Sequence, residues 1–335
     1  DGIIPRVTQD AVTAVVDRFR RFARDEAPGR SAVYEAWARR VTDDAAVAAA
    51  LARIPETRRQ PPLVFAVMRL LGAPLDDVDA WSSWVLDHAD AIVAECGRRS
   101  VQTNEPLRCA ALLPALSLIE GPIALLEVGA SAGLCLFPDR YSYRYRRGGE
   151  LVTLDPADGP SSVVLDSDLE GHPDLRMPEI VWRAGIDLSP LDARSEQDRS
   201  WLTGLVWPGE QGRLERIERA LDIAAAAPPV LVAGDGAGAL PALAATAPAG
   251  ATLVLTTPGV LAHVPRVHRA AVIDAARTAG RWITLDAPGL HDGWTRRPEP
   301  ARGGFALALD GEVLAEVDPL GAWVAWHPES RAAAQ

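Results

Sequence analysis

The chain has 335 residues, a formal net charge of -11 and 48% hydrophobic residues, so it can bury a large core in one domain or two. The acidic balance argues against a surface that tracks nucleic-acid backbone, and no apolar run reaches the length of a membrane span. We therefore expect a soluble globular protein that acts on a small molecule, with neither nucleic acid nor a membrane as partner.

Cysteine and histidine usage gives no sign of a disulfide framework or a metal centre. The three cysteines, Cys96, Cys109 and Cys135, are odd in number and widely spaced, and the six histidines form no zinc-type pair. No metal is predicted. The first residues read as neither a signal peptide nor a transit peptide, which favours the cytoplasm; the oligomeric state stays open.

Helical patterns fill the sequence up to about residue 120. The spacing of Val12, Val15, Phe19 and Phe22 is typical of an amphipathic helix. Six helices are predicted: Ala11–Asp25, Ser31–Arg40, Asp43–Ile54, Pro61–Leu71, Val78–Gly97 and Arg108–Ile119. They predict an N-terminal helical cap or lid over residues 1–120.

From residue 121 onward, apolar strand-like runs alternate with helical segments, as in a mostly parallel sheet. The predicted strands are Ala124–Val128, Ile180–Asp187, Val230–Asp235, Thr252–Thr257 and Trp282–Asp286, and the clearest helices are Arg213–Ala227 and Val267–Ala279. A loop over Arg296–Gly303, a hairpin of Phe305–Leu309 and Val313–Val317 around Asp310-Gly311, and a strand over Ala322–Trp326 follow. Residues 121–335 thus form a predicted α/β domain.

Residues 137–179 are predicted as an insertion that contains a hairpin, Tyr141–Tyr145 with Glu150–Leu154. Its strands place tyrosines on one face and arginines on the other. The hairpin either packs through its tyrosines with a solvated charged face, or uses Tyr141 and Arg144 to bind an anionic substrate. Asp155 fits the usual spacing for the second acidic strand end, but the hairpin makes Asp187 the preferred candidate.

The most informative stretch is Leu125–Gly133, LLEVGASAG, in which a buried strand runs into a turn of small residues. Gly129, Ser131 and Gly133 let backbone amides approach a ligand closely, and the carboxylate of Glu127 can accept bonds from ribose hydroxyls. The alternative is an ordinary small-residue turn with Glu127 facing solvent.

The sequence also resembles a known bacterial family. The segments that carry the resemblance are Gln102–Glu105 with Arg108–Ala110, Leu125–Leu136, Asp139–Tyr141, Trp182–Leu188 with Pro190–Asp192, and Trp207–Pro208. They look like a family of unknown function whose members resemble S-adenosylmethionine-dependent methyltransferases in fold. The resemblance implies a Rossmann-like class I methyltransferase-type sheet, mostly parallel with one reversed strand, behind the helical cap.

That resemblance implies S-adenosylmethionine as cofactor. Glu127, Gly129, Ser131, Gly133, Asp187 and Asp235 are then the candidate cofactor-binding residues. Gln102, Asn104 and Arg108 join Tyr141 and Arg144 as candidate substrate-binding residues. Glu105 is a candidate catalytic residue that could hold substrate or the methionine amino group. Asn104 or Thr103 could instead cap the next helix. His263 is the first candidate base and His291 the second.

Two features differ from the pattern of these relatives. Cys135 stands where asparagine is usual, and Thr256-Thr257-Pro258 ends the fourth strand where a histidine and a small hydroxyl residue are more common. The alternatives to methyl transfer are therefore a binding or partner protein that keeps the fold without methylating, and an enzyme that catalyses elimination or cyclisation on an anionic small molecule.

Overall fold

The computed structural model describes residues 8–210, 212–295 and 301–327. The chain divides into two compact units and passes between them more than once. The first unit is Asp1–Thr103 with Glu196–Glu215, and the second is Asn104–Ser195 with Arg216–Gln335. The predicted loop over Arg296–Gly303 lies partly outside the described residues.

The described part of the first unit is helical. It contains α1 (Gln9–Asp25), α2 (Ala32–Asp43), α3 (Ala45–Leu51), a short 3₁₀ turn (Glu56–Arg58), α4 (Pro61–Leu70), α5 (Val78–Asp87), α6 (Ala89–Arg98) and α8 (Glu196–Gly204). Side chains of Thr8, Ser31, Asp44 and Asp77 cap four of these helices, which explains where they begin. The single helix predicted over Val78–Gly97 is wrong, because His88 separates two helices.

An aromatic cluster forms the core of the first unit. Trp37 and Trp81 stack with ring centres 5.0 Å apart, and Phe65 packs edge-on against Trp37. The later segment of the chain enters this core through Trp207, whose ring centre lies 5.1 Å from that of Phe22 and 5.6 Å from that of Tyr34. The segment around Trp207 is therefore part of the packing of this unit.

In the described part of the second unit, eleven strands form one sheet. They are β1 (Pro122–Val128), β2 (Ser142–Arg147), β3 (Glu150–Leu154), β4 (Val164–Glu170), β5 (Glu179–Asp187), β6 (Val230–Ala233), β7 (Thr252–Pro258), β8 (Arg281–Asp286), β9 (Phe305–Leu309), β10 (Glu312–Val317) and β11 (Trp323–Trp326). Their order is β3-β2-β4-β11-β10-β9-β8-β7-β1-β5-β6.

Five neighbouring strands, β8-β7-β1-β5-β6, are parallel. The chain moves outward from β1 through β5 to β6, then returns to the other side of β1 to form β7 and β8. The strand order therefore reverses between β1 and β7, and in open α/β sheets such a reversal is where ligands bind, beyond the carboxyl ends of the strands. An α/β fold with a mostly parallel sheet is confirmed.

The prediction of one reversed strand is wrong. Four pairs are antiparallel, β2 with β3, β8 with β9, β9 with β10, and β10 with β11. Strand β4 is absent from the sequence prediction, because its residues VLDSDLE alternate between buried and exposed positions and carry three acids. It joins β11 to β2 and so connects the hairpin to the rest of the sheet.

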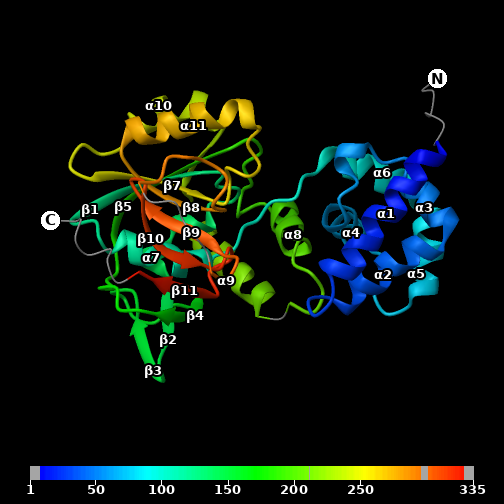
Figure 1. Cartoon of the computed structure of the whole chain (residues 1–335), viewed down its shortest axis with the longest axis horizontal. Helices are drawn as coiled ribbons and strands as arrows, with labels where there is room; N and C mark the ends of the chain where they lie inside the picture. Colours follow the sequence, from blue (N-terminus) through cyan, green and yellow to red (C-terminus); the bar gives the residue numbers. More distant parts are fainter. Residues whose placement is uncertain (1–7, 211, 296–300, 328–335) are drawn as a thin grey trace. The chain divides into compact units, whose positions relative to one another are not determined.

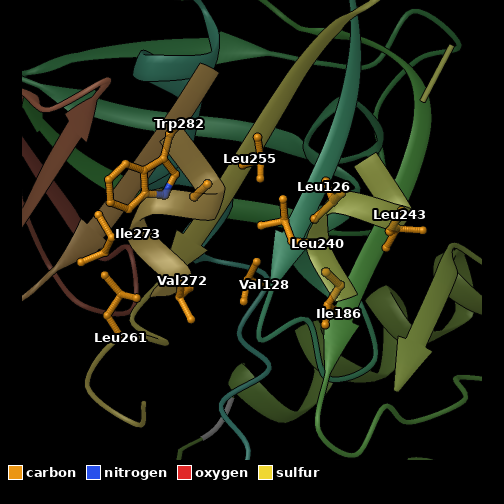
Figure 2. Close-up of a cluster of buried hydrophobic side chains, with 12 residues drawn as sticks. Leu126, Val128, Ile186, Leu240, Leu243, Leu255, Leu261, Val272, Ile273 and Trp282 are labelled. Atoms are coloured by element: carbon orange, nitrogen blue, oxygen red, sulfur yellow. The ribbon is translucent and has the colours of Figure 1, made fainter. Parts of the chain in front are cut away.

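Helices lie on both sides of the sheet (Figure 1). On one side lie α10 (Gly236–Ala244) and α11 (Arg266–Ala279), and on the other lies α7 (Arg108–Leu116), which is buried along its whole length. Helix α9 (Arg213–Ala226) precedes β6. Figure 2 shows the core beneath α10 and α11, where Leu126 and Val128 of β1 meet Leu240, Val272 and Trp282. Because side chains alternate along a strand, Glu127 points to the opposite face.

No α-helix lies between β1 and β5. Two 3₁₀ turns (Leu134–Leu136 and Pro138–Arg140) and strands β2, β3 and β4 fill this connection instead. The predicted hairpin is confirmed, and its three tyrosines are fully buried. Their hydroxyls donate to the backbone oxygens of Leu134, Pro138 and Ala110. The tyrosine face therefore anchors the hairpin to the unit's core.

Candidate functional site

The turn after β1 has an unusual backbone. Gly129, Ser131 and Gly133 have φ angles of 81°, 53° and 74°, and Ser131 is one of two described non-glycine residues with positive φ. A Cβ atom on Gly129 would lie 2.4 Å from Cγ2 of Val260, so only glycine fits there. The amide of Gly129 donates to the oxygen of Ile186 at 2.8 Å, which ties the turn to β5.

Glu127 lies buried at the end of β1, with 4% of its surface exposed. Its Oε2 is fully buried and makes no hydrogen bond to any described residue. Burial is the main cause that raises the pKa of this carboxyl well above its usual value; Cys135 and Asp187 add to the rise, and Arg108 opposes it. The alternative that Glu127 merely faces solvent is wrong. A buried polar atom without a partner is costly, and such atoms call for an explanation such as a ligand.

Asp187 ends β5, directly beside β1. Its Oδ2 accepts a hydrogen bond from the amide of Ser131 at 2.8 Å, and its Oδ1 accepts from the amide of Ser189 at 2.9 Å. The first of these bonds holds Ser131 in its strained conformation. Asp155 instead follows β3 and accepts from Ser142 and Arg144, so Asp187 is the acid that ends the strand next to β1.

The Asn104-Glu105 segment braces the same turn. Asn104 Oδ1 accepts from the amide of Leu134 at 3.4 Å, while its buried Nδ2 has no partner among the described residues. Glu105, 1% exposed, pairs with Arg216 of α9 at 2.8 Å and accepts from the amide of Leu107 at 3.0 Å. Helix α7 begins after Leu107 without a side-chain cap, so the expected capping by Asn104 or Thr103 is wrong. Gln102 belongs to the first unit.

Arg108 reaches from α7 to the carboxyl end of β7. Its Nη1 donates to the oxygen of Pro258 at 2.9 Å and its Nε donates to the oxygen of Pro319 at 3.0 Å. A Cβ atom on Gly259 would lie 3.1 Å from its Nη2. Arg108 is 8% exposed, and its charge acts on two buried carboxyls, those of Glu127 and Asp286.

Asp286, which ends β8, is not among the site residues predicted from sequence. It is fully buried, and neither of its carboxylate oxygens makes a hydrogen bond to the described residues. Burial raises its pKa to about 8, although Arg108, Arg269 and the nearby amide of Leu261 act in the opposite direction. The sequence feature that could have identified Asp286 is a predicted strand ending in an acid, the same feature that selects Asp187.

The thiols of Cys109 and Cys135, distant in sequence, meet beneath the turn. Cys109 donates to the backbone oxygen of Cys135 at 3.6 Å, and Cys135 donates to that of Glu105 at 3.5 Å. The Cys109 thiol and burial together raise the pKa of Cys135 well above its usual value. Both side chains are buried free thiols, and the raised pKa of Cys135 makes it a poor nucleophile at neutral pH.

The other candidate residues have identifiable partners or lie apart from the turn. Arg144 pairs with Asp155 at 2.8 Å, and Tyr141 is buried beneath the hairpin. Asp235 caps α10 by accepting from the amides of Ala237 and Gly238. His263 is exposed in a turn between β7 and α11.

His291 follows β8 in the loop that leads toward β9. It packs against Trp282 and Trp294, with ring centres 5.6 Å and 4.2 Å away. Burial, with smaller effects of neighbouring charges, lowers its pKa to about 4, so the ring is neutral at physiological pH. A neutral imidazole can accept a proton, but one with such a low pKa is a weak base.

Comparisons with known proteins give one family. Searches among curated proteins and among solved structures find no match. None of the described helices is long and apolar enough to cross a membrane. The family described as "Uncharacterized protein conserved in bacteria (DUF2332)" matches residues 16–326, nearly the whole length. The chain therefore belongs to this bacterial family.

Proposed function

We propose that the second unit binds S-adenosylmethionine at the carboxyl ends of β1 and β5 and transfers its methyl group to a small molecule. The observation that carries the proposal is the buried Oε2 of Glu127, which lies without a partner among the described residues, below a turn of positive φ angles. This turn stands where the strand order reverses, the usual ligand position in Rossmann-like sheets.

The connection after the turn favours this cofactor over a dinucleotide. Dinucleotides place their pyrophosphate on the N-terminus of the helix that follows the glycine turn. Here a 3₁₀ turn, Leu134–Leu136, follows instead, and a buried carboxyl lies in the preceding strand. A carboxylate repels phosphate but attracts a sulfonium or an ammonium group. S-adenosylmethionine carries both of these cations and no phosphate.

Each proposed role uses carboxylate oxygens that can still accept a hydrogen bond. Glu127 would accept hydrogen bonds from the cofactor and balance its positive charge. Asp187 already accepts two backbone bonds, but ionised carboxylate oxygens each have a second acceptor position, which a ribose hydroxyl could use. Methyl transfer from a sulfonium is an in-line displacement, so alignment of the two reactants supplies much of the rate. His263 is the first base proposed from sequence.

Calorimetric titration with S-adenosylmethionine and S-adenosylhomocysteine tests the proposal. We expect binding by the wild type, with Glu127→Gln weakening S-adenosylmethionine binding by about tenfold or more, as expected for loss of a charge-assisted hydrogen bond. Glu120→Gln is the matched control, because Glu120 is exposed in the turn before β1. No binding of either compound would refute the proposal. Binding unaffected by Glu127→Gln would remove Glu127 from the site.

The pH dependence separates this site from non-specific binding. Glu127 has a raised pKa, so it gains its negative charge only as the pH rises, while Arg108, Cys135 and Asp187 are the other titratable groups that act on it. S-adenosylhomocysteine lacks the sulfonium charge. The preference for S-adenosylmethionine over S-adenosylhomocysteine should therefore increase with pH in the wild type and stay constant in Glu127→Gln.

A further inference from the structure

The carboxyl end of β8 holds a second acid that the proposed cofactor site does not use. Asp286 is 0% exposed, and neither of its carboxylate oxygens has a hydrogen-bond partner of good geometry among the described residues, although the amide of Leu261 is near enough to act on it. Leaving buried polar groups unpaired costs about 1–3 kcal/mol each. The buried oxygens therefore suggest a partner outside the chain.

The position of Asp286 relates it to the cofactor site. Strand β7 pairs with β1 on one side and with β8 on the other, so all three strands end at the same edge of the sheet. The amide of Gly259, just after β7, donates to the oxygen of Leu285 at 2.7 Å, which fixes the end of β8 beside this edge. Asp286 thus lies two strands from Glu127 at the same edge of the sheet. Its side chain is on the face of β8 that carries Trp282, so the two acids approach this edge from opposite faces of the sheet.

The charged groups around Asp286 come from the two covering helices. Arg108 of α7 and Arg269 of α11 both act on it, whereas the neighbouring strands β7 and β9 contain no titratable residue. The Arg269 guanidinium donates to the backbone oxygens of Leu261, Val264 and Leu290, so it holds the two loops rather than the acid. Arg108 likewise donates to backbone oxygens and forms no ion pair with Asp286.

We propose that Asp286 binds the amino group of the methyl acceptor and takes a proton from it, which makes the acceptor an amine. This inference rests on the proposed function. An ammonium group has several N–H donors and a positive charge, so it can satisfy both carboxylate oxygens at once. A hydroxyl has one donor and no charge and would leave one oxygen without a partner.

The reaction balances without a further reactant. The ammonium group transfers a proton to the Asp286 carboxylate, which leaves a neutral amine with a free electron pair. That pair attacks the methyl carbon; the carbon–nitrogen bond forms as the carbon–sulfur bond breaks, and the electrons of the broken bond remain on sulfur. The products are the methylated ammonium group, S-adenosylhomocysteine and protonated Asp286, whose proton passes to solvent when the next ammonium group binds.

The electrostatics favour an amine over an alcohol. Arg108, Arg269 and the sulfonium place three positive charges near the acceptor and so make an ammonium lose its proton more easily. Burial raises the pKa of Asp286 to about 8. A general base works best when its pKa lies near the operating pH. An alcohol is a far weaker acid, and a carboxylate takes its proton much less readily.

The experiment uses the full chain, S-adenosylmethionine and a panel of matched small molecules, in which each primary amine is paired with the alcohol of the same skeleton. Formation of S-adenosylhomocysteine and of methylated product is followed by mass spectrometry. Amines should react and their alcohol partners should not. Asp286→Asn should lower kcat by about 100-fold or more, the usual size of a lost proton transfer, and leave S-adenosylmethionine affinity within about twofold.

A binding measurement gives a readout independent of turnover. The reactive amine is titrated into the S-adenosylhomocysteine complex in two buffers of different ionisation enthalpy. Because Asp286 holds a proton at neutral pH, formation of the ammonium–carboxylate pair should release about 0.9 proton at pH 7 for a pKa of about 8. Asp286→Asn should release none, and Asp274→Asn, which changes an exposed acid on α11, should behave as the wild type.

The outcomes separate the two proposals. Absence of cofactor binding refutes the proposed function and this inference with it. Three outcomes refute only the amine site, provided that the cofactor binds. They are turnover of the alcohols, no reaction of any amine in the panel, and full activity in Asp286→Asn. If Asp286→Asn fails to fold, Asp286→Ser replaces it, because the smaller hydroxyl removes the carboxylate without adding volume.

Discussion

Replacing Asp286 with asparagine should stabilise the protein, and the gain should depend on pH. The pKa of Asp286 is about 8 in the folded protein, against 3.8 for an ordinary aspartate. Between these two pH values, Asp286 therefore keeps a proton in the folded protein and loses it in the unfolded chain. Stability from this group is complete below about pH 4 and is lost as the pH rises to about 8.

The magnitude follows from the size of the shift. Each pKa unit corresponds to about 1.4 kcal/mol, and pH 7 lies 3.2 units above the ordinary value of 3.8, so keeping the buried acid protonated costs up to about 4 kcal/mol at pH 7. The Asp286→Asn variant escapes this cost, because its amide has a similar shape and never ionises. We expect the stability difference to be small near pH 4 and to approach about 4 kcal/mol at pH 7.

Urea unfolding followed by circular dichroism measures the difference between about pH 4 and pH 8. Asp274→Asn serves as the control, since this exposed side chain should shift stability by less than about 0.5 kcal/mol. Parallel stability curves for wild type and Asp286→Asn across the pH range would refute the reasoning, because they would mean that Asp286 titrates normally.

Four further measurements probe other parts of the second unit. Gly129→Ala should destabilise it by about 1–3 kcal/mol, measured by thermal melting, because the new Cβ meets Val260 at positive φ. Asp235→Ala should cost about 1 kcal/mol through loss of the α10 cap and leave S-adenosylmethionine affinity unchanged in calorimetry; a large loss of affinity would instead support a role in binding. Arg216→Met should destabilise the fold by about 3 kcal/mol in urea unfolding, because it removes the ion-pair partner of buried Glu105. His291 should remain neutral in an NMR titration down to about pH 4, and protonation near pH 6.5 would contradict its burial.

Much of the sheet could be predicted because its strands are short apolar runs that end in acids or turns. β1, β5, β7, β8 and the β9–β10 hairpin lie close to their predicted positions. The strand β4 could not be found in this way, since its acids lie on a solvated face. The connection between β1 and β5 departs from the βα alternation, because the buried tyrosines of the hairpin fill the place of a helix.

The site was only partly predictable for a related reason. Glu127 and Asp187 follow from a local motif and from strand ends. Asp286 has the same local signal, but its importance depends on burial and on the lack of hydrogen-bond partners among the described residues, which are tertiary properties. The same holds for Arg144, whose pairing with Asp155 cannot be read from charge alternation alone.

The return of residues 196–215 to the helical unit has a consequence for how the protein is made. Trp207 packs against Phe22 and Tyr34, and Arg69 donates to the backbone oxygens of Gly204 and Val206. A ribosome synthesising the chain must therefore produce the sequence through β5 and α8 before the N-terminal helices can complete their core. Until then the side of the aromatic cluster that Trp207 covers stays exposed. This is the stage at which a chaperone would bind the exposed apolar surface.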